Sequence, residues 1–363
     1  MYTSHINNIH VEVTDRCNAE CPVCPRSMSG GETFPYTRDK ELSLEYFKLI
    51  GKEFLSKINN WNFCGVKGDP ASAQDLFEIL DYILHCNPET RILIRTNGGA
   101  RNEKFWSKIG NLFVGKDCDV VWSIDGWEDT NHIYRKNVKW NKLFNNLYAY
   151  IKTGASSMWE FNLFAHNDLD LPKVKEFCNL HNICLDIREP FGFERDGDIY
   201  KSIGVYNKTG DGRTSKLAYT IKPYGVPQDK IADIHPETND IHDFVPGVYD
   251  LHHMSYLKTS GTTVKCQSTR IGIGTKSHSQ EIYLDSNGMI FPCCYTAGKF
   301  HMGDEQINEM YRPFKKQLTV SSDRSIYDVL NLDLFTKIMP KGMSGKLDDP
   351  AGYCITCVQH CKF

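Results

Sequence analysis

Apolar residues in the first half of the chain fall into two alternating patterns. Short apolar runs of about five residues, bounded by polar or turn-forming residues, are typical of strands buried in a sheet. Longer stretches have apolar residues three or four positions apart, as one face of a helix does. The short runs predict strands at His10–Thr14, Trp61–Gly65, Ile92–Thr96, Val120–Ile124, Phe161–Ala165 and Cys184–Arg188.

Helices are expected between these strands. Ser43 is a suitable cap for the first of them, because its hydroxyl can accept from an exposed backbone N–H. The predicted helices are Ser43–Lys57, Leu76–Leu84, Asn102–Ile109, Leu143–Ile151 and Leu171–His181. Repeated strand–helix units predict a parallel sheet with right-handed crossovers. Six units suit an α/β fold with a partial, open (β/α)6 TIM-type barrel, whose chemistry lies at the C-terminal ends of the strands.

The remaining chain breaks this pattern. Residues 191–262 are rich in glycine, proline and polar side chains, so they are expected to form an insertion or linker that packs over the barrel mouth or binds substrate. In residues 263–363, Asn287-Gly288 predicts a hairpin turn between apolar strands within Glu281–Cys293. A helix is expected at Ile326–Met339. The predicted organisation is therefore a barrel at 1–190, an insertion at 191–262 and a small hairpin-plus-helix domain at 263–363.

Composition excludes some partners and compartments. The 363 residues include 42 basic and 45 acidic side chains and carry a net charge of −3, with no basic run that would indicate nucleic acid. No apolar run approaches membrane-spanning length, and the first residues lack the features of a signal peptide, so a cytoplasmic location is expected. Fourteen cysteines in a long cytosolic chain favour metal or redox chemistry.

Three of these cysteines follow the first strand in a C-x3-C-x2-C array. They are Cys17, Cys21 and Cys24. A 4Fe-4S cluster normally takes four thiolates, so a three-cysteine loop leaves one iron open to a ligand that is not protein. A structural zinc site and three buried free thiols are the alternatives.

The spacing and place of this array resemble the radical S-adenosylmethionine (radical SAM) superfamily. The resemblance implies that SAM occupies the open iron and is cleaved by one electron to a 5'-deoxyadenosyl radical, which abstracts hydrogen from substrate. Members usually have an aromatic residue just before the third cysteine, where this chain has Val23.

Further motifs at the predicted strand ends are similar to those of the superfamily. Gly68-Asp69 resembles its G-G-E segment, Thr96-Asn97-Gly98 its T-N-G, and Ser123 to Gly126 with Tyr134-Arg135 the S-I-D-G and Y-R pattern of its peptide-modifying branch. The resemblance implies SAM contacts from Gly68, Asp69, Asn97, Ser123, Asp125 and Arg135. Ordinary turn chemistry is the alternative for Asp69, Asn97 and Asp125, and a solvated helix position for Arg135. His166 and Asn167 are expected to face the site without an assigned role.

The cysteines near the C-terminus are similar to the SPASM/twitch extension of radical SAM enzymes. That resemblance implies one auxiliary 4Fe-4S cluster on Cys266, Cys293, Cys354 and Cys357, with Cys361 as an alternative ligand. Zinc held by Cys354, Cys357 and His360 or Cys361 is the alternative. The other cysteines are expected in the core: Cys64, Cys86, Cys118, Cys178 and Cys184.

Cys294 directly follows a predicted cluster ligand. In some protein-modifying relatives this place holds an aspartate that takes a proton from substrate. A thiol there is a candidate catalytic base, ligand or hydrogen donor. A buried, inert cysteine is the alternative.

The predicted function is radical SAM chemistry on a peptide or protein residue, by epimerisation, cross-linking, oxidation or excision. The resemblance implies an electron donor such as flavodoxin or ferredoxin. Because the first strand is expected by about residue 10, peptide recognition would come from a separate small protein. A small-molecule dehydrogenase acting on an aminosugar-type alcohol and a non-catalytic iron–sulfur protein are the other hypotheses.

Overall fold

The structure is a computed structural model. It describes residues 6–22, 24–26, 33, 37–188, 190, 193–196, 199–202, 225 and 280–338. Six parallel strands form an open sheet in chain order, and a hairpin extends it beyond the first strand. The six strands are β1 (Ile6–Val11), β2 (Asn60–Phe63), β3 (Arg91–Thr96), β4 (Cys118–Ser123), β5 (Ser157–Asn162) and β6 (Cys184–Arg188). The predicted partial barrel is confirmed; it is not closed.

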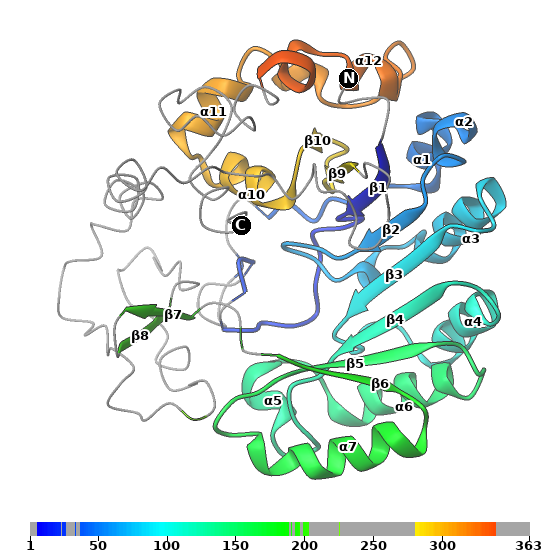
Figure 1. Cartoon of the computed structure of the whole chain (residues 1–363), viewed down its shortest axis with the longest axis vertical. Coiled ribbons are helices and arrows are strands. Elements are labelled where there is room, and N and C mark those ends of the chain that lie inside the picture. Colours follow the sequence, from blue (N-terminus) through cyan, green and yellow to red (C-terminus); the bar gives the residue numbers. More distant parts are fainter. Residues whose placement is uncertain are drawn as a thin grey trace.

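Helices pack on the outer side of the curved sheet (Figure 1). The strand residues that face them are apolar and almost fully buried, including Trp61, Ile92, Val120 and Trp159. The helices are α1 (Leu44–Ile50), α2 (Lys52–Leu55), α3 (Leu76–Cys86), α4 (Glu103–Phe113), α5 (Asn131–Tyr134), α6 (Trp140–Ile151) and α7 (Leu171–Leu180), with short 3-10 turns η2 (Pro70–Ser72) and η3 (Asp168–Asp170). The sheet and this helical layer enclose the core.

The predicted first helix is broken in two. Gly51 has a φ of 97°, which ends α1 and begins α2 in a new direction. Ser43 caps α1 as expected, since its hydroxyl accepts from Tyr46 N at 3.3 Å. Asn102 likewise caps α4, which runs on to Phe113, beyond the predicted end at Ile109.

Two observed strands begin and end three or four residues before their predicted bounds. β1 is Ile6–Val11 instead of His10–Thr14, and β5 is Ser157–Asn162 instead of Phe161–Ala165. Past β5 the chain turns, because the Asn167 side chain accepts from Phe164 N at 2.8 Å and donates to Asn162 O at 3.0 Å. Phe164 is buried by that turn and not by a strand.

The inner face of the sheet is polar. Successive strand residues point to opposite faces, so residues between the outward apolar positions face the barrel interior. Arg95 and Glu160 pair there across the sheet, and Arg188 lies 2.9 Å from the Glu160 carboxylate. A TIM-type barrel usually fills its interior with branched apolar side chains. This interior instead offers charged and hydrogen-bonding groups.

The C-terminal hairpin joins the barrel sheet. Its strands are β9 (Gln280–Leu284) and β10 (Ile290–Phe291), and β9 pairs with β1 in parallel. The predicted Asn287-Gly288 turn is present: Gly288 has a φ of 77°, and the Asp285 carboxylate accepts from Asn287 N at 2.9 Å and Met289 N at 2.8 Å. The hairpin therefore continues the barrel instead of starting a separate sheet.

Short helices follow the hairpin, and the later ones lie above it in Figure 1. The predicted helix Ile326–Met339 is in fact two short pieces with a turn between them, and Met339 lies outside the described residues. Those two pieces are α12 (Ile326–Leu330) and the π-helical turn η8 (Leu334–Ile338), and the helices before them are α10 (Cys294–Met302), α11 (Glu305–Tyr311) and η7 (Lys315–Gln317). Within the predicted insertion, β7 (Phe193–Asp196) and β8 (Ile199–Ser202) form an antiparallel pair. The domain boundaries stay predictions.

Among the described residues, none of the helices combines the length and apolar character needed to span a bilayer.

Candidate active site

The three-cysteine loop leaves the C-terminal end of β1 and is anchored immediately. Thr14 forms an isolated bridge with Glu41. The Asp15 carboxylate accepts from Lys40 N at 2.7 Å and Arg38 N at 3.0 Å, and Arg26 donates to Asp15 O. The first acidic residue of the loop is thus tied to the chain that returns after the cysteines.

The three thiols come from one loop and interact electrostatically. Cys21 is buried, and Cys17 and Cys24 are half-buried. Burial raises the pKa of Cys17 well above its usual value, and the Asp69 carboxylate and the other two thiols raise it further. Burial likewise raises the pKa of Cys21 to about 12 and that of Cys24. Burial and the interactions among the thiols therefore oppose their ionisation.

Asn97 connects the end of β3 to this loop. Its Nδ2 lies 3.5 Å from Cys17 Sγ and donates to Asn18 Oδ1 at 3.1 Å. The Ala19 backbone N–H also lies 3.3 Å from Cys17 Sγ. The predicted site residue Asn97 therefore contacts the first cysteine directly.

Asp69 holds Asn97 in place. One carboxylate oxygen accepts from Ala71 N and from Thr96 Oγ1, both at 2.9 Å, and the other accepts from Asn97 N at 2.7 Å. The carboxylate is buried, and burial raises its pKa. Its oxygens are engaged in fixing the ends of β2 and β3 to each other, as the turn alternative expects.

Gly68 lies against the backbone at the end of β1. A Cβ added there would lie 1.8 Å from Thr14 O. The Gly68 N–H donates to Glu12 Oε1 at 3.2 Å. Only glycine permits this approach, which brings the loop after β2 against the base of the cysteine loop.

Asp125 and Arg135 form a second connection to the cysteines. Arg135 Nε donates to Asp125 Oδ2 at 2.5 Å, and Arg135 Nη1 lies 3.8 Å from Cys21 Sγ. The other Asp125 oxygen accepts from Asn162 N at 2.7 Å and Asn162 Nδ2 at 2.9 Å. Arg135 is not a solvated helix arginine, because only 16% of its side chain is exposed.

Ser123 is the last residue of β4 and pairs in register with Glu160. It is half-buried on the interior face of the sheet. His166, after β5, is also half-buried, and its Nε2 has no hydrogen-bond partner within the described part of the chain. Burial lowers the pKa of His166. The structure thus places both residues beside the ends of β4 and β5, and no hydrogen bond of the described residues joins either of them to the three cysteines.

A buried ion pair near the site was missed by sequence reasoning. Lys67 Nζ lies 3.6 Å from Glu12 Oε2, with both side chains almost fully buried. Tyr283 of β9 donates to the same oxygen at 3.1 Å, and Lys67 N donates to Glu12 Oε1 at 2.5 Å. The signal was a carboxylate inside an apolar run, where a charge needs a partner.

Cys293 and Cys294 lie where β10 ends and α10 begins. Cys293 is the N-cap of α10, and its Sγ lies 3.1 Å from Thr296 Oγ1. Cys294 is half-buried, and burial raises its pKa, with Cys293 and Cys64 as further causes. The other predicted auxiliary-cluster residues, Cys266, Cys354, Cys357, His360 and Cys361, lie outside the described residues.

The remaining described cysteines differ in burial. Cys86, Cys118 and Cys178 are buried as core residues, as expected. Cys64 is half-buried and Cys184 is exposed on the edge strand β6, so neither is a fully buried hydrophobe.

The described thiols of the cysteine loop are not arranged around one metal ion. In the described part of the chain, no three His, Cys, Asp or Glu side chains converge as ligands of one metal ion. A cubane takes each thiolate on a different iron, so its cysteines stand farther apart. The N–H donors on Cys17 and Cys21 also suit sulfurs that carry negative charge.

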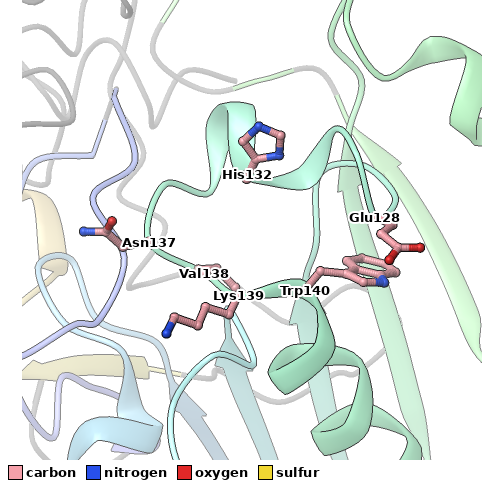
Figure 2. Close-up of a pocket in the computed structure, with 6 residues that line it drawn as sticks. All are labelled: Glu128, His132, Asn137, Val138, Lys139 and Trp140. Carbon is pink, nitrogen blue, oxygen red and sulfur yellow. The ribbon is translucent and has the colours of Figure 1, made fainter.

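A surface cavity of about 570 Å³ lies beside this loop. Figure 2 shows that its lining side chains, which include His132, Lys139 and Trp140, come from the segment that runs from the end of β4 to the first residue of α6. In the same segment, Lys136 O accepts from Glu20 N at 3.1 Å. The wall of the cavity is therefore bonded to the cysteine loop.

No protein-family model and no curated protein sequence matches the chain. Among solved structures, Streptococcus suis SuiB bound to its precursor peptide SuiA is similar, with a TM-score of 0.52 and 11% identity over 95% of this chain and 70% of that one. The SuiB structure bound to S-adenosylmethionine has a TM-score of 0.47 and 12% identity, over 80% of this chain and 61% of that one. In the comparison with that S-adenosylmethionine-bound structure, the chain spans less than two thirds of SuiB.

The enzyme anSMEcpe with bound AdoMet and a peptide is also similar. It has a TM-score of 0.47 and 14% identity, over 93% of this chain and 84% of that one. SuiB and anSMEcpe are radical SAM enzymes. At these identities the likeness to SuiB with its precursor peptide establishes the fold.

Proposed function

We propose that this chain, which has the fold of radical SAM enzymes, is itself a radical SAM enzyme. Cys17, Cys21 and Cys24 would hold a 4Fe-4S cluster whose fourth iron binds SAM. Such a cluster supplies the one electron that cleaves SAM, and the 5'-deoxyadenosyl radical so formed abstracts hydrogen from a substrate residue.

One observation carries the proposal: side chains from two further strand ends converge on the cysteine loop. Asn97 lies against Cys17 Sγ and Arg135 against Cys21 Sγ. Asp69 and Asp125 hold these two side chains in turn. A loop of inert thiols has no need of N–H donors brought from distant strands.

Arg135 is the residue that we propose for the SAM carboxylate. Its guanidinium uses Nε on Asp125 and Nη1 on Cys21. The second terminal nitrogen, Nη2, is then the atom that we propose donates to the SAM carboxylate. Ser123 lies at the end of the same strand that Asp125 follows, so we place it in the same SAM site.

Gly68 and Asp69 act in this proposal mainly by shaping the SAM site. The Asp69 oxygens already accept from Ala71, Thr96 and Asn97, so the carboxylate would interact with the SAM ammonium group through its charge. Gly68 lets the loop after β2 approach the loop that follows β1. Both residues would close one side of the SAM site.

A peptide or protein residue is the substrate that we propose. SuiB, which has this fold, is known in complex with a precursor peptide. The polar interior of the barrel, with Arg95, Glu160 and Arg188, offers partners for the amides and charges of a peptide. An auxiliary cluster at Cys293, an electron donor such as flavodoxin or ferredoxin, and a separate peptide-recognition protein belong to this proposal as well.

Anaerobic reconstitution tests the proposed cluster and SAM cleavage. Wild-type protein with dithionite and SAM should release 5'-deoxyadenosine, detected by liquid chromatography and mass spectrometry. Replacing Cys17, Cys21 or Cys24 by alanine should abolish that release. Cys86→Ala, a thiol at the far end of α3, is the matched control and should retain it. Release by a variant that lacks all three loop cysteines would refute the assignment.

A further inference from the structure

The Asp125–Arg135 pair presents a positive group to a cysteine sulfur. Asp125 is fully buried and 16% of the Arg135 side chain is exposed. The carboxylate lies at Nε and the Cys21 sulfur at Nη1, on opposite sides of one guanidinium. The pair is therefore an oriented dipole with its positive end on the sulfur. Burial keeps water and salt from screening it.

We infer that Arg135, held by Asp125, is a positioning residue that raises the reduction potential of the cluster on Cys17, Cys21 and Cys24. The inference rests on the proposed function. It goes beyond the proposed grip on the SAM carboxylate, because it assigns Arg135 an effect that is present before SAM binds.

The physical reason is the charge of the two cluster states. Reduction adds one negative charge, which spreads over the iron and its sulfur ligands. A nearby positive charge and an N–H donor on a ligand sulfur stabilise the reduced state more than the oxidised state. Cys17 already has donors from Ala19 N and Asn97 Nδ2. On Cys21, Arg135 is the side chain that supplies both the donor and the charge.

Asp125 prevents Arg135 from turning elsewhere. The carboxylate is itself fixed by Asn162 N and Nδ2, while the Asp125 N–H donates to Asn131 Oδ1 at 3.0 Å. With Nε bound, the guanidinium plane is set and Nη1 remains directed at the sulfur. Loss of Arg135 would also leave the Asp125 charge unopposed near Cys21. The change in potential should therefore have one sign, toward harder reduction.

Potentiometric titration of the reconstituted, SAM-free protein, followed by electron paramagnetic resonance, tests this inference. Arg135→Gln should keep the loop cluster but lower its potential, so that at the wild-type midpoint the ratio of reduced to oxidised cluster falls about tenfold, or 59 mV for one electron. Arg135→Lys keeps the positive charge without the planar guanidinium, so it should lower the reduction potential less. Lys139→Gln removes an exposed charge from the same segment and should not shift the potential.

The outcomes separate the possibilities. An unchanged SAM-free potential in Arg135→Gln, with only weaker SAM binding, would overturn the inference and leave Arg135 as a SAM ligand alone. An equal change of potential in Lys139→Gln would also overturn the inference, because it would show that loss of any nearby positive charge has this effect. If Arg135→Gln loses iron, the potential of Arg135→Lys decides, because a wild-type potential there would overturn the inference and a smaller lowering would support it. Loss of iron from both variants would overturn the inference and assign Arg135 to cluster assembly. Wild-type protein that takes up no cluster would refute the proposed function itself.

Discussion

Replacement of Asp69 by alanine separates the two roles considered for this residue. As a SAM contact alone, its loss would weaken SAM binding and leave the fold intact. In the structure its carboxylate accepts from Ala71 N, Thr96 Oγ1 and Asn97 N, all inside the protein. Asp69→Ala would remove the acceptor from all three. We therefore expect a loss of stability in the absence of SAM.

The size of that loss follows from the orphaned donors. A buried donor left without its partner costs about 1–3 kcal/mol. Two backbone N–H groups, at Ala71 and Asn97, lose theirs, and the hydroxyl of Thr96 can rotate to another acceptor. The variant also no longer buries a carboxylate, whose pKa is raised by that burial, and this recovers part of the cost. We expect the free energy of unfolding to fall by about 2–4 kcal/mol.

Urea unfolding followed by circular dichroism measures this change. The midpoint should move to lower urea at an unchanged slope, because the surface exposed on unfolding stays the same. Asp81→Ala is the matched control, since Asp81 is exposed on α3, and its effect should stay within about 0.5 kcal/mol. A loss of less than about 1 kcal/mol for Asp69→Ala would refute the structural role.

Three further predictions concern other parts of the site. Burial lowers the pKa of His10 from 6.5 to about 4. The unfolded state then takes up the proton first, so the stability present above pH 6.5 should fall by about 1 kcal/mol between pH 7.5 and 5.5. His10→Asn should flatten that slope, and an equal slope would contradict the assignment. Gly68→Ala would bring a Cβ within 1.8 Å of Thr14 O and should cost at least about 1–3 kcal/mol in urea unfolding, whereas Gly298→Ala, with open space around it, should not destabilise. Cys294→Ala should retain cluster iron and 5'-deoxyadenosine release yet lose the product formed from the true substrate, as mass spectrometry would reveal; unchanged turnover would leave Cys294 as an inert thiol.

The sequence predicted strands well where alternation and flanking turns agreed. Cys184–Arg188 is a strand with the predicted bounds. The strand before it was displaced, because Phe161 to Ala165 is the most continuous apolar run, whereas the true strand alternates buried Ser157, Trp159 and Phe161 with half-buried residues. Phe164 is apolar for a different reason: its ring packs 4.6 Å from that of Tyr134.

The candidate site residues were identifiable from motifs, but their contacts were not. Strand-end positions place Asn97 and Asp125 at one edge of the sheet in any parallel barrel. That Asp69 engages Asn97, and Arg135 reaches Cys21, depends on how three loops fold back over that edge. The relevant partners are separated by 28 and 114 positions. No local pattern encodes such pairs.

The pairing of β9 with β1 gives the two proposed cluster regions a common support. β1 leads directly into the loop of Cys17, and β9 leads through the hairpin to Cys293. Glu12, just past β1, is bound by Lys67 after β2 and by Tyr283 of β9. Breaking this buried cluster would leave a charge without its partner, which costs more than a surface pair. A change at Glu12 should therefore disturb both regions together.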